Sequence, residues 1–180
     1  MTYEKTPHVG AATITVRRTG APTRGILVLD GAPIPVALGR GGLKANKREG
    51  DGGTPTGTFR PVRLWWRKDR HARPRTLLPV RAIGPGDGWC EDPADRRYNQ
   101  PIRLAGDSSA DRLMRADHLY DFIIEIDHNT QPRIAGRGSA VFLHLARPGF
   151  APTAGCIAMT RGSMLRLLGR LTRGTRIIVR

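Results

Sequence analysis

The chain has few cysteines, few lysines and no long hydrophobic segment, and each shortage excludes a class of protein. Its two cysteines, Cys90 and Cys156, cannot build a disulfide framework or a zinc site of four cysteine ligands. No run of about 18 apolar residues occurs, so we expect no membrane span. The N-terminal segment lacks the apolar stretch of about 7–15 residues that marks a signal peptide, so no signal peptide is visible. The histidines and cysteines lack metal-ligand spacing, and we expect no metal.

Acidic residues are also scarce relative to basic ones. Thirty Lys and Arg residues against 15 Asp and Glu give a formal net charge of +15, and 26 of the basic residues are arginine. This charge fits either a solvated, arginine-rich surface or a polyanionic partner such as nucleic acid, anionic lipid or an acidic cell-wall polymer. The arginines are scattered, unlike those of a nucleic-acid-binding tail. We expect no nucleic-acid partner, and a basic binding module without catalysis stays open as an alternative.

The rest of the composition is that of a folded domain rich in turns. Apolar residues make up 39% of the chain, which also contains 22 glycines and 14 prolines. A chain of 180 residues is about the size of one domain. The many turn residues predict short strands.

The N-terminal part predicts three strands. Residues 12–18 are rich in β-branched side chains, and residues 25–30 form a short apolar run that ends in an Asp-Gly hairpin signal. Residues 32–38 supply the partner strand. Its two prolines lack an amide proton, which places this strand at an edge of the sheet.

Later segments predict more strands around a glycine-rich loop. Residues 39–57 hold seven glycines without the spacing of a nucleotide-binding loop, which favours a β-rich loop. Apolar and β-branched runs predict strands at residues 77–83, 120–126, 138–145 and 174–180.

Two segments predict helices. Residues 107–119 predict a short helix with Ser108 or Ser109 at its N-cap. Residues 161–173 predict an amphipathic helix, whose apolar face comprises Met164, Leu165, Leu168 and Leu171.

His144 and Cys156 are the pair best placed for nucleophilic catalysis. A cysteine attacks as the thiolate, and a nearby imidazole accepts its proton and later returns it to a leaving amine. Of the five histidines, His144 alone ends an apolar strand that leads through a Pro/Gly loop to Cys156. Gly155 permits a tight turn that can aim the amides of Gly155 and Cys156 at an oxyanion, and Thr153 adds a hydroxyl.

Each of these residues also has a purely structural interpretation. Free cysteines are among the most buried residues, and a histidine at a strand end can pack half-buried without a catalytic role. Side chains in the loop at residues 84–100 either line a binding surface or pack beneath the loop. These candidates for the cleft are Trp89, Tyr98 and Asn99, together with Tyr120 at the start of a predicted strand.

Four segments, in order, resemble the L,D-transpeptidase (YkuD-like) catalytic domain family. The most specific is the strand histidine followed by Thr-Ala-Gly-Cys-Ile-Ala-Met at residues 153–159, which is similar to the family's Ser/Thr-x-Gly-Cys signature. Thr-Pro-Thr-Gly-Thr-Phe at residues 54–59 resembles a second family element, and residues 120–124 and 174–179 resemble its central and closing strands. The resemblance covers residues 13–180 as one catalytic domain and leaves residues 1–12 as an N-terminal tail.

The resemblance implies a mainly β, sandwich-like or barrel-like domain with one or two short helices. It implies that Cys156, activated by His144, attacks a carbonyl of a peptidoglycan stem peptide and forms a thioester without any cofactor. Attack by the amine of a second stem then gives a cross-link, and attack by water gives L,D-carboxypeptidase activity; hydrolysis of lipoprotein linkages is a further alternative. Such an enzyme works in the bacterial cell envelope or periplasm, is acylated by carbapenems, and is expected here to be a monomer.

Two positions depart from the family pattern. Ala154 stands where many members have histidine, and Ala158 where many have an arginine that helps to bind a substrate carboxylate. We expect Arg147 or Arg161 to replace that arginine. Ser139, a substrate-binding candidate, or a backbone carbonyl would orient the catalytic histidine. The sequence therefore indicates a divergent subgroup.

Overall fold

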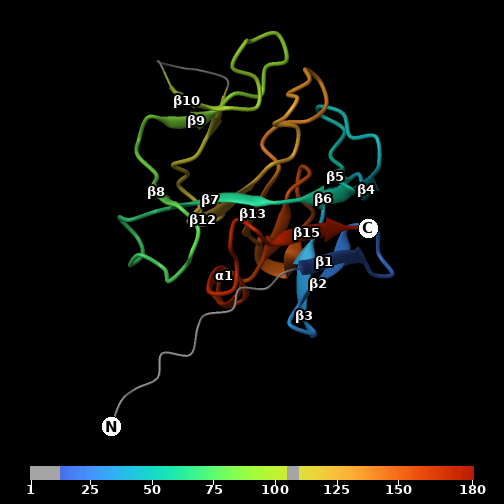
Figure 1. Cartoon of the computed structure of the whole chain (residues 1–180). Coiled ribbons are helices and arrows are strands. Elements are labelled where there is room, and N and C mark those ends of the chain that lie inside the picture. The colour runs from blue at the N-terminus through green and yellow to red at the C-terminus, as the bar shows by residue number, and fades with distance from the viewer. Residues whose placement is uncertain (1–12, 105–109) are drawn as a thin grey trace.

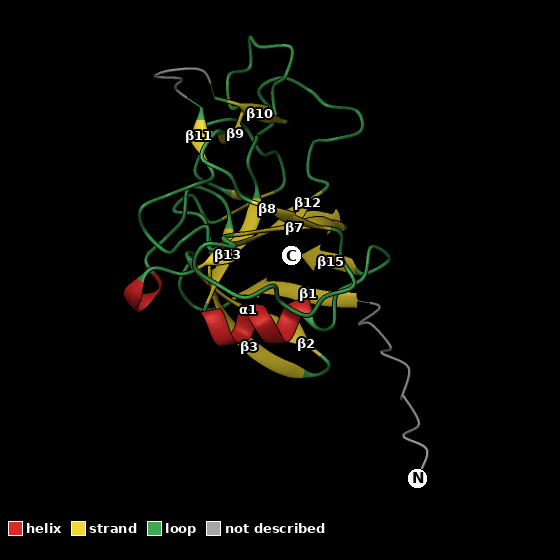
Figure 2. Cartoon of the chain, turned by 90° about the vertical axis from the view of Figure 1, so that its left-hand side faces the viewer, coloured by secondary structure: helices red, strands yellow, loops and turns green. Residues whose placement is uncertain are grey.

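A curled, ten-stranded mixed sheet dominates the computed structural model, which describes residues 13–104 and 110–180 (Figure 1). In spatial order its strands are β6 (Gly57–Phe59), β15 (Arg176–Val179), β1 (Thr13–Arg18), β2 (Arg24–Leu29), β3 (Ala32–Ala37), β14 (Ile157–Met159), β13 (Phe142–Leu145), β12 (Phe122–Ile126), β7 (Pro61–Trp66) and β8 (Val80–Ala82). The curl places β1–β3 in a separate layer from β7, β8 and β12 (Figure 2). This arrangement and the single α-helix of the described residues confirm the mainly β fold class.

The N-terminal strands follow the predicted hairpin order. β1 pairs with β2 and β2 with β3, and the predicted Asp-Gly turn has positive φ at both Asp30 and Gly31. The prediction that β3 is an edge strand was wrong, because β14 follows it in the sheet. β3 nevertheless pairs with β14 only through Ala37, opposite Ala158, so its prolines need not donate to that neighbour.

Helix α1 (Arg161–Leu168) packs one side against the core of the curled sheet. Thr160 caps its N-terminus, since the Thr160 hydroxyl accepts a hydrogen bond from the amide of Ser163 at 3.2 Å. The helix is shorter than predicted, and Leu165 lies on its outer side at 37% exposure. The core face instead comprises Met164, Leu167, Leu168 and, beyond the helix, Leu171, which keep the i, i+3, i+4, i+7 spacing.

The prediction of a helix over residues 107–119 was wrong for its described part. Residues 105–109, with both predicted N-cap serines, lie outside the described residues. β11 (Asp111–Arg112) pairs with β9 (Asp87–Trp89), which also pairs with β10 (Pro101–Arg103) in a small three-stranded sheet. Pairing with a distant strand outweighs local helix propensity here.

Two further short elements complete the fold. β4 (Leu43–Lys44) pairs with β5 (Thr54–Pro55) within the predicted β-rich loop, and η1 (Pro148–Phe150) is a single 3₁₀ turn between β13 and β14. Within the described residues, no helix has the length and hydrophobicity needed to cross a membrane.

Candidate active site

Adjacent parallel strands bring His144 and Cys156 together. His144 lies within β13, Cys156 directly precedes β14, and the two strands pair with His144 opposite Ala158. Because side chains alternate between the faces of a strand, Cys156 and Ala158 share the face of the sheet on which His144 lies. One strand pairing thus joins the two residues across the loop that separates them in sequence.

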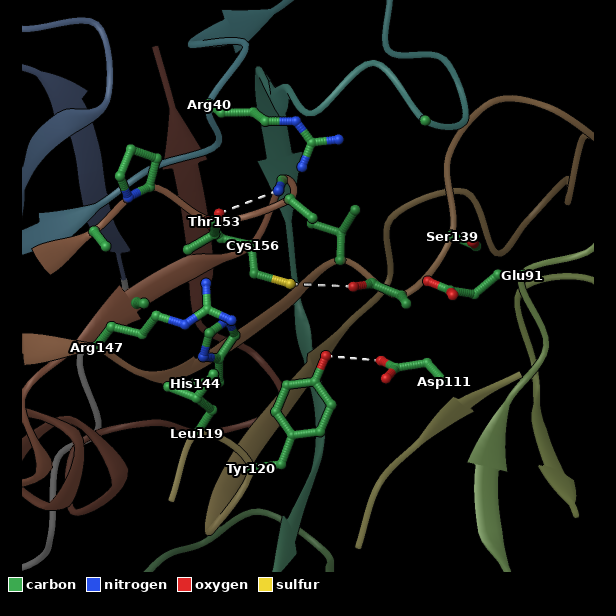
Figure 3. A pocket seen from close by; sticks show the side chains of 18 of the residues that line it. Arg40, Glu91, Asp111, Leu119, Tyr120, Ser139, His144, Arg147, Thr153 and Cys156 are labelled. Atoms are coloured by element: carbon green, nitrogen blue, oxygen red, sulfur yellow. Dashed lines mark hydrogen bonds between the residues drawn. The ribbon is translucent and has the colours of Figure 1, made fainter. Parts of the chain in front are cut away.

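The Cys156 sulfur is a buried thiol held by two backbone groups. It accepts a hydrogen bond from the amide of Phe142 at 3.3 Å. It donates one to the carbonyl of Ala140 at 3.2 Å (Figure 3). The side chain is 7% exposed, and burial raises the pKa of the thiol to about 12. The resting sulfur is therefore protonated at neutral pH.

His144 has a defined tautomer. Its Nδ1 lies 2.8 Å from the carbonyl oxygen of Leu145, which only accepts hydrogen bonds, so Nδ1 carries the proton and Nε2 is a free base. Burial lowers the pKa of His144 to about 4, which keeps the ring neutral. The ring of Tyr120 packs edge-on against the imidazole at 5.4 Å between centroids. Of the two predicted orienting groups, the backbone carbonyl makes this contact, whereas Ser139 bonds to Glu49 at 2.8 Å.

The turn before Cys156 requires glycine and a hydroxyl. Gly155 has φ of 145°, and a Cβ there would lie 2.8 Å from the carbonyl oxygen of Gly53. The buried Thr153 hydroxyl donates to the carbonyl of Cys156 at 2.6 Å and accepts from the amide of Gly155 at 3.1 Å. In the resting site the Gly155 amide therefore already has a partner, which an oxyanion would have to displace.

Both reactive groups line one cavity of about 520 Å³. Figure 3 shows Arg40 and Arg147 on one side of the Cys156 sulfur and Glu91 and Asp111 on the other. Neither arginine forms an ion pair with any residue that the structure describes. The cavity thus has two unpaired arginines on one side of the thiol and two carboxyl groups on the other, where the Arg115 guanidinium also lies 4.0 Å from Asp111.

The acidic side holds carboxyl groups with unusual proton affinity. Burial and the nearby charges of Asp111 and Glu49 raise the pKa of Glu91 to about 7. Burial also raises the pKa of Asp111, whose carboxylate accepts a hydrogen bond from the Tyr120 hydroxyl at 2.7 Å. Near neutral pH, Glu91 therefore exists in both protonation states.

Most of the predicted site residues share this cavity. Those that line it are His144, Cys156, Gly155, Thr153, Ser139, Tyr120 and Arg147. Those outside its lining are Trp89, Tyr98 and Asn99. Of the two arginines proposed to replace the family's missing one, Arg147 lies in the cavity and Arg161 does not.

The three predicted cleft residues outside the lining are buried beneath the site. The Trp89 indole donates to the Asn99 side-chain carbonyl at 3.0 Å, and the same oxygen accepts from the amide of Ala140 at 3.2 Å. Ala140 has φ of 50°, a conformation rarely adopted by alanine, and its carbonyl is the acceptor for the Cys156 thiol. The Tyr98 hydroxyl donates to Glu49. These side chains support the backbone that holds the sulfur.

Sequence reasoning identified Arg147 but missed the other charged residues of the cavity. These are Arg40, Lys47, Glu49, Glu91, Asp111 and Arg115. They come from segments far apart in the chain and carry no common motif. Arg40, Lys47 and Glu49 lie in the glycine-rich loop at residues 39–57, which the sequence singles out for its glycines and not for these charged side chains.

The arrangement suits nucleophilic attack by a sulfur on a carbonyl. A thiol, a neutral imidazole with a free Nε2 and a basic cavity wall lie together. Both members of the pair are neutral in the resting site.

The site thus combines a histidine in one strand with a cysteine that directly precedes the neighbouring strand of a curled β-sheet. The sequence model of the YkuD family, the L,D-transpeptidase catalytic domain, matches residues 14–179, so the chain belongs to this family. Comparison with curated proteins gives no significant match.

Three solved structures from Mycobacterium tuberculosis are similar to the chain. L,D-transpeptidase 3 with a faropenem-derived adduct has 14% identity and a TM-score of 0.41, and the match covers 93% of this chain and 60% of that protein. L,D-transpeptidase 1 has 14% identity and a TM-score of 0.39, and the match covers 93% of this chain and 61% of that protein. An L,D-transpeptidase of strain H37Rv has 10% identity and a TM-score of 0.42, and the match covers 93% of this chain and 57% of that protein. The chain therefore spans about three fifths of the length of these proteins.

Proposed function

We propose that this chain is a cysteine-dependent L,D-transpeptidase that links peptidoglycan stem peptides through a thioester on Cys156. The observation that carries the proposal is the shared cavity of Cys156 and a His144 whose Nε2 is free to accept a proton. Family membership supports the substrate class. Residues 13–180 would form one catalytic domain, acting as a monomer in the cell envelope, with residues 1–12 as a tail.

In the first half-reaction the Cys156 sulfur attacks the carbonyl of an L-configured centre of the donor stem. The thiol proton leaves the Ala140 carbonyl and passes to Nε2 of His144 as the carbon–sulfur bond forms. Collapse of the tetrahedral intermediate breaks the amide bond, and His144 gives the proton to the leaving amine. A D-amino acid departs, and the donor remains as a thioester.

In the second half-reaction the amine of an acceptor stem attacks the thioester. Nε2 of His144 takes a proton from the attacking amine, a new amide bond forms, and the proton returns to the sulfur. Water in place of the amine would give the carboxypeptidase reaction. The acidic side of the cavity, with Glu91 and Asp111, would favour the acceptor over water because it attracts an ammonium group, and the ionised Glu91 carboxylate would take the extra proton so that a neutral amine attacks.

The oxyanion would be held by the amides of Gly155 and Cys156. Each such donor contributes about 3 kcal/mol in other acyl-transfer enzymes. The Gly155 amide becomes available when the Thr153 hydroxyl gives up its hydrogen bond, which it can do without losing its bond to the Cys156 carbonyl.

Carboxylate recognition would fall to Arg147 and Arg40. Ala158, opposite His144, leaves space where many family members have an arginine. Arg147 lies in the same cavity without an ion-pair partner among the described residues, which supports it as the replacement. A guanidinium binds a carboxylate through two parallel hydrogen bonds, which would fix the end of the donor stem.

The test is incubation of the protein with a disaccharide-tetrapeptide, followed by mass spectrometry. We expect an acyl adduct on the peptide that contains Cys156, together with cross-linked dimers. Cys156→Ala should abolish both, whereas Cys90→Ala, which removes a buried thiol outside the cavity, should retain them. Carbapenem acylation of Cys156 is a second readout.

The outcomes separate the alternatives. Tripeptide product without dimers, even with excess amine acceptor, would make the chain a carboxypeptidase. Unchanged products from the Cys156→Ala variant would refute the nucleophile. Salt-sensitive binding to sacculi with no turnover by any variant would favour the basic binding module.

A further inference from the structure

A second, larger cavity lies on the α1 side of the molecule. It has a volume of about 1010 Å³ and runs between α1, the segment at residues 71–77 and the β2–β3 turn. We call it the α1 groove. Its lining shares no residue with the cavity of Cys156. A ligand in the α1 groove would therefore leave the candidate active site open.

The α1 groove has apolar surface on its floor and on both edges. The buried side chains of Leu29 and Phe122 lie in its floor. Leu77 and Leu165, from the segment at residues 71–77 and from α1, are 58% and 37% exposed. Together with Ile134, they are the large apolar side chains that the described part of the chain exposes. Two of these three exposed side chains thus line one groove.

Unpaired positive charge surrounds the apolar surface. The arginines of the lining that form no ion pair with a described residue are Arg73, Arg75, Arg161 and Arg166. The carboxylate of the described lining, Asp30, is already paired with Arg170 at 2.8 Å. The groove therefore offers four free guanidinium groups and no free acid to balance them.

We propose that the α1 groove binds an acidic, amphipathic segment of a partner protein. Such a segment places apolar side chains between Leu77 and Leu165 and carboxylates against the four free arginines. A polyanion such as nucleic acid or an anionic glycan would satisfy the arginines but leave both leucines in water. A bilayer is flat and cannot enter a concave groove, so a folded or extended peptide segment fits this shape best.

The probe is a fluorescent synthetic peptide of 18 residues made of leucine and glutamate. Its leucines follow the i, i+3, i+4, i+7 spacing of one helix face, and a scrambled peptide of the same composition serves as the composition control. Binding to the full chain is measured by fluorescence anisotropy at constant salt. We expect the patterned peptide to bind at least about tenfold more tightly than the scrambled one.

Variants locate the binding surface. Leu77→Asp and Leu165→Asp should each weaken binding of the patterned peptide about tenfold, and Arg73→Glu with Arg166→Glu should do the same. Ile134→Asp and Arg18→Glu are the matched controls, because both positions are exposed and lie outside the groove. They should change binding less than about twofold. Thermal unfolding of each variant verifies that the fold is retained.

Three results would overturn the proposal. The first is equal affinity for the patterned and scrambled peptides, which would indicate a charged surface without apolar recognition. The second is peptide binding that the leucine variants leave unchanged. The third is binding of heparin or of vesicles with anionic lipid that depends on Leu77 and Leu165 while the patterned peptide fails to bind.

Discussion

Desolvation controls the chemistry of the individual side chains in the site. The same burial that raises the pKa of Cys156 to about 12 lowers that of His144 to about 4, so both are neutral in the resting protein. A thiolate–imidazolium pair formed in advance would be costly in this environment. In the proposed mechanism the proton therefore leaves the sulfur during the attack and not before it.

The depressed pKa of His144 predicts how stability depends on pH. Since the folded-state pKa is about 4 and the unfolded-state value about 6.5, the unfolded chain binds more protons between these values, and stability falls as pH drops through this window. This histidine should make the protein about 2 kcal/mol less stable at pH 5 than at pH 7.

Denaturant unfolding of the wild type and of His144→Asn at both pH values measures this effect. Glu91 acts in the opposite direction, because its pKa is raised, so the comparison between the two proteins isolates the histidine. An identical pH dependence in both proteins would contradict the buried, neutral histidine.

Replacement of Arg147 tests which arginine binds the substrate carboxylate. Arg147→Gln should raise KM for the donor peptide about tenfold with a smaller effect on kcat, because it removes binding that is common to substrate and transition state. Arg161→Gln, at the other position proposed from the sequence, should leave KM unchanged since Arg161 lies outside the cavity. Steady-state kinetics of the two variants decide between them, and the reverse pattern would assign the role to Arg161.

At the level of secondary-structure elements, the site depends on one strand pairing and one turn. The pairing of β13 with β14 brings His144 and Cys156 to one face of the sheet, and the turn at Thr153–Gly155 sets the direction of the sulfur. The turn is fixed by a hydroxyl with two buried backbone partners and by a glycine with positive φ.

Loss of the Thr153 hydroxyl should damage both stability and activity. Thr153→Val leaves the Cys156 carbonyl and the Gly155 amide without their partner in a buried turn, which costs about 2–3 kcal/mol. Thr160→Val, which removes the N-cap of α1 outside the cavity, should cost about 1 kcal/mol with little change in turnover. Chemical denaturation and the muropeptide assay compare the two variants, and equal losses of turnover would argue against a special role for the turn.

At the level of the whole molecule, the net charge of +15 is spread over the chain, while the reactive pair is buried and uncharged. The charged side chains and the candidate catalytic pair are therefore separate sets of residues in this protein. Long-range attraction between exposed arginines and an anionic polymer weakens as salt screens it, whereas buried groups are screened much less.

Salt should therefore affect binding to the polymer more than turnover. Sedimentation with purified peptidoglycan sacculi should show most of the protein bound at low salt and about a tenth bound at about 500 mM salt. Turnover of a small soluble tetrapeptide should change by less than about threefold over the same range. Cys156→Ala should bind sacculi like the wild type, and binding that ignores salt would refute a role for the surface charge.

Prediction from sequence succeeded where the signal is local. β-branched and apolar runs located β1, β2 and β12, and the segment around Cys156 supplied the proposed nucleophile and its turn. It failed in the described residues 110–119, where part of an expected helix is β11, paired with β9. It also left open whether Trp89, Tyr98 and Asn99 line the cleft or pack beneath it, since a loop sequence does not tell whether a side chain faces a cavity or lies under one; the structure buries all three outside the lining.

The sequence by itself determined the mainly β character and the family, and it proposed Cys156 and His144 as the catalytic pair, because these inferences depend on residue types at fixed short spacings. Only the tertiary structure decided the rest of the site. The free Arg40 and Arg147 and the acidic side with Glu91 come from segments that meet only when the sheet curls, and the structure identifies the carbonyl that orients His144 as that of the adjacent Leu145. Their proton affinities follow from burial, which is a property of the packed chain and not of any segment.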